Sequence, residues 1–167
     1  MVLTKSELIE NLQNEVRILQ HLTTKIEPNM VDYRPTPKQR STIDLLRYLT
    51  VMGPILVKAA LTGSFDRDEW GARAAAVADK DLAGVVAALA AHSAEYNELL
   101  ANLPDEAFRK EIDIFGNKTS AGSFIVRMVL GGCAAYRTQL FCYLKACGRE
   151  ELGTMNLWGG IDPPPAA

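Results

Sequence analysis

Residues 120–148 read SAGSFIVRMVLGGCAAYRTQLFCYLKACG, and this pattern decides the fold class. Apolar side chains recur there in steps of three and four, which is the spacing of one face of an α-helix. These positions are Val126, Val129, Cys133, Tyr136, Leu140 and Tyr143. Thr119 or Ser120 suits the N-cap, and Gly148 suits the residue just beyond the C-terminus. The stretch therefore predicts one long helix with a face to bury against other helices.

Two earlier segments carry the same spacing. The first opens at Thr4 with the capping-box pattern TKSE and stops at Pro28. The second starts at Ser41, a good N-cap residue, with Asp44 in its first turn. Their apolar positions are Leu8, Leu12, Val16, Leu19, Leu22 and Ile26 in the first and Leu45, Leu49, Met52, Leu56 and Ala59 in the second. Each segment is long enough to run the length of a small helical bundle.

A third helix is expected after Asp79 or Asp81 and before Pro104. Its spacing indicates an apolar face made of Leu82, Val86, Leu89, Ser93, Tyr96 and Leu100. Four helices of roughly 20 to 28 residues, each with one face to bury, are typical of a helical bundle. We therefore predict an all-α protein, an up-down four-helix bundle that forms a single domain over residues 1–167.

The connections between these helices are not all short. Residues 27–40 hold three prolines and must run extended for much of their length, whereas residues 66–78 predict a short extra helix. Residues 111–116 alternate in polarity and suggest a short extended strap. The tail, residues 156–167, is expected to dock on the bundle through Trp158 and to leave the last few residues loose.

Composition and charge argue against several classes of partner. The formal net charge is −2 and charges of both signs are interspersed, so neither nucleic acid nor an anionic membrane is an expected partner. The longest uncharged apolar stretch that we identify, about Leu82 to Ala91, is short of the roughly 20 residues of a membrane span. The three cysteines have no C-x-x-C spacing and no signal peptide precedes them, which indicates reduced thiols and a cytoplasmic location.

The chain is poor in catalytic motifs. Its two histidines, His21 and His92, lie on different predicted helices, whereas zinc usually needs three or four ligands. His92 and Glu95 resemble half of a metal-binding pair, but a solvated helix face is the simpler interpretation. The Gly131–Gly132 pair is more unusual, because each glycine costs a helix about 1 kcal/mol relative to alanine. Close packing, for example of the Tyr136 ring, or a small hollow for a ligand would offset that cost.

Two stretches resemble motifs of the DinB-like superfamily. Residues 41–48, STIDLLRY, are similar to its second-helix motif, in which a cap and a leucine pair lead to a metal-binding histidine; Tyr48 occupies that position here. Residues 129–140, VLGGCAAYRTQL, are similar to its H-x-x-x-H-R-G-Q-L run, with Gly132 and Tyr136 at the two histidine positions. The remaining positions of that run are Arg137, Gln139 and Leu140, which match, and Thr138, which replaces glycine.

Smaller matches at residues 115–116, 144–148 and 156–163 extend this resemblance over most of the chain. The resemblance implies a four-helix bundle and a homodimer. Family members with all three histidines bind a divalent metal ion, and some are similar to thiol-dependent transferases or isomerases. Glycine has no ligating side chain and neutral tyrosine is a poor metal ligand. We therefore predict that this chain holds no metal and no other cofactor.

Three hypotheses about function follow. The first, which we favour, is a metal-free protein that binds a small organic molecule or a protein at the former metal site, through a pocket lined by Tyr48, Met52, Gly132, Cys133, Tyr136 and Arg137. It assigns no catalytic residue, and it requires that the tyrosine rings do not fill the cleft. The alternative is a transferase- or hydrolase-type enzyme, with a tyrosine as general acid and Arg137 as an anion clamp, although a salt bridge is the simpler role for Arg137. The third is a homodimeric interaction protein, in which the alanine-rich segment 83–91 allows close helix contact.

Overall fold

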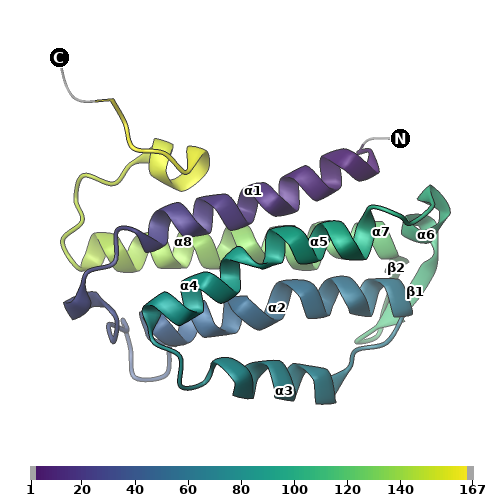
Figure 1. Cartoon of the computed structure of the whole chain (residues 1–167), viewed down its shortest axis with the longest axis horizontal. Helices are drawn as coiled ribbons and strands as arrows, with labels where there is room; N and C mark the ends of the chain where they lie inside the picture. The colour runs from purple at the N-terminus through teal and green to yellow at the C-terminus, as the bar shows by residue number, and fades with distance from the viewer. Residues whose placement is uncertain (1–2, 165–167) are drawn as a thin grey trace.

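Four helical rods lie roughly along one axis in the computed structural model, which describes residues 3–164 except for the side chain of Asn117 (Figure 1). The rods are α1 (Lys5–Thr23), α2 (Thr42–Thr62), the pair α4 (Leu82–Ala90) and α5 (His92–Leu100), and a rod in which α7 (Ala121–Phe124) and the π-helical turn η2 (Ile125–Leu130) run into α8 (Gly131–Ala146). The predicted four-helix bundle is confirmed. The extra helix α3 (Arg67–Val77), also predicted, runs back along α2, so that α2 and the α4–α5 rod point the same way (Figure 1).

Local capping fixes where the helices begin. The Glu7 backbone N–H donates to Thr4 Oγ1 at 3.2 Å, and the Thr4 N–H donates to the Glu7 carboxylate at 2.7 Å. This is the reciprocal capping box that the sequence predicts. Ser41, Asp81 and Ser120 each accept a backbone hydrogen bond at the start of α2, α4 and α7. The helix starts are therefore the best-predicted part of the fold.

The connections add small elements. A 3-10 turn, η1 (Pro28–Met30), follows α1, and the short helix α6 (Asp105–Arg109) follows α5. The predicted strap becomes strand β1 (Glu111–Ile114), which pairs antiparallel with β2 (Asn117–Ser120). The second strand was not predicted, because its polar residues carry no strand pattern and Ser120 also serves as a helix cap.

Two of the predicted buried faces need correction. The α4–α5 rod buries Val85, Leu89, His92, Tyr96 and Leu100, whereas Leu82, Val86 and Ser93 are only half-buried. Both sets have helical spacing, and His92 can lie inside because it finds a backbone acceptor there. In the fourth rod Val126 is 44% exposed instead of buried, since the π-helical turn shifts the helical phase and directs Ile125 and Val129 to the core.

The tail docks on α1, as predicted, but through a different residue. Trp158, the predicted anchor, is 64% exposed, whereas Asn156 is 1% exposed and donates to Asp162 Oδ1 at 2.9 Å. Arg17 donates to the carbonyl oxygens of Gly159 and Gly160 at 2.8 and 3.2 Å. These bonds hold the π-helical turn η3 (Met155–Gly159) beside α1 (Figure 1). The predicted looseness of the last few residues concerns residues 165–167, which lie outside the described range.

One helix, α2, has the length and apolar composition of a membrane span. Inside the bundle, 72% of its most apolar window is buried. Burial of this kind is expected for the core helix of a helical bundle, where all sides of one helix contact others.

Candidate functional site

The structure brings together Tyr48, Gly132 and Tyr136, the residues that the sequence resemblance assigns to the metal-binding histidine positions. Tyr48 on α2 and Tyr136 on α8 meet edge to face, with ring centroids 5.0 Å apart and an interplanar angle of 67°. Gly132 lies one turn before Tyr136 on the same helix. Both tyrosines are half-buried, so each keeps part of its surface exposed to solvent.

Met52 explains Gly132. A Cβ atom added to Gly132 would lie 3.2 Å from both Sδ and Cε of Met52, which is 2% exposed. The thioether therefore occupies the space that a larger residue at position 132 would need, in place of the Tyr136 ring suggested by the sequence. Gly131 is exposed, and nothing in the structure explains its lack of a side chain.

Neither the thiol nor the tyrosine hydroxyl of this region is activated. Burial raises the pKa of the Cys133 thiol to about 12, and Glu15 adds to the effect while Arg137 opposes it. Burial also raises the pKa of Tyr48 to about 12, helped by the adjacent Tyr136 hydroxyl and opposed by Arg40. Both groups are neutral near pH 7, so Cys133 is a poor nucleophile and Tyr48 is a hydrogen-bond donor rather than an anionic ligand.

Arg137 is directed toward α1. Its Nη1 lies 2.9 Å from both carboxylate oxygens of Glu15, and the residue is 2% exposed. The Trp158 ring lies beside it, with its centroid 5.1 Å from the guanidinium carbon. Burial raises the pKa of Glu15, and the ion pair with Arg137 opposes that shift. Arg137 is thus part of an interhelical ion pair, the simpler of the two roles considered for it.

Two residues that the sequence analysis did not select contact Tyr48. The Arg40 guanidinium carbon lies 4.0 Å from the centroid of the Tyr48 ring, and the Trp70 ring lies 5.8 Å away at an angle of 61°. We call Arg40, Tyr48, Trp70 and Tyr136 together the Tyr48 site. Trp70 comes from α3 and Arg40 from the segment before α2, so no spacing rule links them to Tyr48. The only signal in the sequence is the basic run RPTPKQR, residues 34–40, just ahead of the Ser41 cap.

The histidines do not form a metal centre with their neighbours. His92 is 5% exposed and its Nε2 lies 2.9 Å from the Thr50 carbonyl oxygen, which corrects the prediction of a solvated face. Glu95 pairs with Arg73 of α3 instead. Within residues 3–164, no group of three or more histidine, cysteine, aspartate or glutamate side chains is placed to hold a metal ion.

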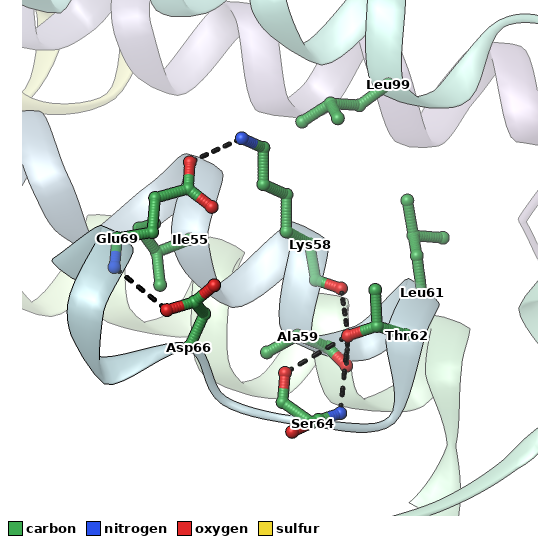
Figure 2. A pocket seen from close by; sticks show the side chains of 9 residues that line it. All are labelled: Ile55, Lys58, Ala59, Leu61, Thr62, Ser64, Asp66, Glu69 and Leu99. Carbon is green, nitrogen blue, oxygen red and sulfur yellow. Dashed lines mark hydrogen bonds and ion pairs between the residues drawn. The ribbon is translucent and has the colours of Figure 1, made fainter.

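Two cavities lie elsewhere on the bundle. Figure 2 shows the first, of about 430 Å³, where the Lys58 ammonium reaches Glu69 at 2.5 Å and Asp66 accepts the Glu69 backbone N–H at 2.8 Å. Since Lys58 pairs with Glu69 and Asp66 caps α3, the charged groups of this cavity already have partners within the chain. The second, of about 750 Å³, lies between the start of α1, α6 and α7. None of the six candidate pocket residues lines either cavity.

The arrangement of the rods, with α3 folded back along α2, is that of a DinB-like four-helix bundle. The chain is similar in structure to the DinB-like protein YjoA from Bacillus subtilis, with a TM-score of 0.67 and 16% sequence identity over 87% of this chain and 94% of that one. No protein-family model and no curated protein matches the sequence. The likeness at this identity establishes the fold.

Proposed function

We propose that this DinB-like chain is a binding protein whose ligand is a small organic molecule, recognised at the Tyr48 site without a metal ion. The observation that carries the proposal is the surrounding of Tyr48, a half-buried ring that contacts two further aromatic rings and one guanidinium group. Aromatic walls with a few placed polar groups are typical of sites for small organic ligands.

The Tyr48 site lies nearer the surface than the pocket that the sequence predicts at the former metal position. Met52 occupies the space beside Gly132, so the interior between α2 and α8 is packed. Tyr48, Trp70 and Tyr136 are half-buried and so remain partly accessible, together with the exposed Arg40. A planar ligand can stack on these side chains and receive hydrogen bonds from the tyrosine hydroxyls and the guanidinium.

These features favour binding over catalysis. A transferase- or hydrolase-type reaction would use a tyrosine as general acid and Arg137 as an anion clamp. Burial makes Tyr48 a weak acid with a pKa of about 12, and Arg137 is already held by Glu15. Stoichiometric zinc, nickel or manganese in the purified protein, found by elemental analysis, would instead favour the enzyme. The homodimer, the cytoplasmic location and the lack of nucleic-acid and membrane partners stay predictions.

A screen of small aromatic compounds by protein NMR tests the proposal. We expect binders to shift the resonances of Tyr48, Trp70 and Tyr136, and Tyr48→Leu to abolish binding. Phe141→Leu is the matched control, because Phe141 is a half-buried aromatic residue on the same helix as Tyr136. The proposal fails if no compound shifts these resonances, or if the shifts map to one of the two cavities.

A further inference from the structure

We infer that the Tyr48 site selects an acid group carried on a planar ring, with Arg40 as the residue that binds the acid. This inference rests on the proposed function and names the ligand class. Its basis is the position of the Arg40 guanidinium, whose carbon lies over the Tyr48 ring, 4.0 Å from the ring centroid. A stacked guanidinium keeps its N–H groups at its edge, where they remain free for two parallel hydrogen bonds to a carboxylate or phosphate.

Within residues 3–164, no carboxylate pairs with Arg40. Among the described residues, the carboxylate nearest in sequence, Asp44, is bonded to Arg34 at 3.3 Å, Arg47 at 3.4 Å and the Ser41 hydroxyl at 2.7 Å. No ion pair within residues 3–164 includes Arg40. The guanidinium is therefore exposed, oriented and open to an external anion.

The backbone of Arg40 is held in place before any ligand arrives. The Tyr143 hydroxyl donates to the Arg40 carbonyl oxygen at 3.0 Å, and Gln139 donates to the Tyr143 hydroxyl at 2.5 Å. Two residues later the Thr42 N–H donates to the Tyr33 carbonyl oxygen at 2.9 Å. Because these bonds fix the segment, the backbone of Arg40 does not have to be ordered when an anion binds, which limits the entropic cost.

The local charge also favours an anion. Residues 34–47 hold four cationic side chains and one carboxylate, whereas the whole chain has a net charge of −2. Their cations are Arg34, Lys38, Arg40 and Arg47. The start of α2, a helix of 21 residues, adds the partial positive charge of a helix N-terminus. A cationic ligand would meet this field and would have to displace Arg40 from the Tyr48 ring.

The remaining members of the site accommodate the ring. Trp70 and Tyr136 contact Tyr48 at angles of 61° and 67°, so their rings stand across the Tyr48 ring rather than parallel to it. An aromatic acid bound to the Arg40 edge therefore has aromatic surface beside it for stacking or edge contacts. Aliphatic acids use the guanidinium alone and are expected to bind more weakly.

The test uses benzoate and phenyl phosphate as anionic probes, benzamide as the neutral probe and benzylammonium as the cationic probe. Dissociation constants are measured by NMR, with the Trp70 indole N–H and the Arg40 side-chain N–H as reporters. We expect an anionic probe to bind at least about tenfold more tightly than benzamide, as charge-assisted hydrogen bonds imply. We expect Arg40→Gln to remove that preference and Arg40→Lys to restore part of it.

Lys38→Gln is the control, because it removes a neighbouring exposed positive charge from the same segment. It should weaken the anionic probes less than about threefold, as a screened surface charge would. Equal binding of benzoate and benzamide, tighter binding of benzylammonium, or unchanged anion binding in Arg40→Gln would overturn the inference. In each of those cases binding that is still lost in Tyr48→Leu leaves the proposed function intact. If no probe shifts the Trp70 reporter, the proposed function fails as well.

Discussion

A substitution at Gly53 tests how tightly the core beneath the Tyr48 site is packed. A methyl group on Gly53 of α2 would lie 2.0 Å from the Tyr96 hydroxyl oxygen and 3.2 Å from its Cζ. Tyr96 is 1% exposed, so its ring has no space into which to move. Alanine favours a helix over glycine by about 1 kcal/mol, but this gain shrinks before Pro54, and overpacking a core costs about 1–3 kcal/mol or more.

We therefore expect Gly53→Ala to lower the free energy of unfolding by about 2–3 kcal/mol. For a chain of this size the melting temperature should fall by about 4–12 °C. Urea unfolding followed by far-UV circular dichroism measures the change directly. The denaturant slope should stay constant, because the surface exposed on unfolding does not change.

Gly132→Ala is the matched control. Its new methyl group would meet the Met52 thioether at 3.2 Å, which is the flexible end of a side chain and can shift by a few tenths of an ångström. The helical preference for alanine then offsets the small strain, and stability should stay within about 1 kcal/mol of wild type. If Gly53→Ala is as stable as wild type, or if Gly132→Ala is the more damaging change, the packing argument is wrong.

Three further predictions address the lost metal site, the buried histidine and the assembly. Histidines in place of Tyr48, Gly132 and Tyr136, in a Met52→Ala background that makes room at position 132, should create Zn²⁺ affinity measurable by calorimetry; no gain would contradict the assignment of these positions to the former metal site. Burial lowers the pKa of His92, and the hydrogen bond to Thr50 and the charge of Glu95 oppose that shift. Below a pH of about 6.5 the unfolded chain therefore binds more protons at this residue than the folded chain does, and the free energy of unfolding falls as the pH drops. His92→Gln should reduce the loss of stability between a pH of about 7.5 and about 5.5, measured by urea unfolding. His21→Gln is measured in parallel, because the pKa of His21 is also lowered. If His92→Gln loses as much stability as wild type over this range, His92 is not the source of the pH dependence. Ala83, Ala87 and Ala91 form an exposed stripe along α4. If this stripe is the homodimer interface, Ala87→Glu should yield a monomer in light scattering, whereas Ala75→Glu on α3 should remain a dimer. A wild-type protein that is itself a monomer would refute the predicted homodimer.

The sequence predicted the helix caps well and the contacts between helices poorly. Thr4 and Ser41 cap the helices that the sequence assigned to them, because a cap needs only the next turn of its own chain. The predicted face of the α4–α5 rod was wrong for half of its residues, because two stripes have helical spacing and only the position of Thr50 on another helix makes His92 acceptable inside. Trp158 failed as the tail anchor for a similar reason, since the tail is held by hydrogen bonds of Asn156, and the apolar pattern of the sequence does not report on such bonds.

The residues of the candidate site could likewise be predicted only in part from the sequence. Tyr48 and Tyr136 could be paired from the sequence, because a family motif assigns both positions to one place. Arg40 and Trp70 reach Tyr48 from the segment before α2 and from α3, and no periodicity within α2 reports on either. Arg137 matched the family motif, but its partner Glu15 belongs to α1, so the ion pair appears only in three dimensions.

The packing around Gly132 indicates that a ligand is not needed in the interior between α2 and α8. A glycine in a helix interior costs about 1 kcal/mol relative to alanine, and full burial of a methionine side chain contributes about 1.5–3 kcal/mol. Met52 is 2% exposed and fills the space beside Gly132, so the core itself occupies this space and no bound molecule is needed to explain the glycine. The interior at the place that the sequence resemblance assigns to a metal ion is therefore occupied by the chain itself. What packing does not explain is Arg40, a cation held over an aromatic ring by an anchored backbone and left without an acid. A ligand for this protein is accordingly to be sought at the outer edge of the two tyrosines, where Arg40 lies, and not between α2 and α8.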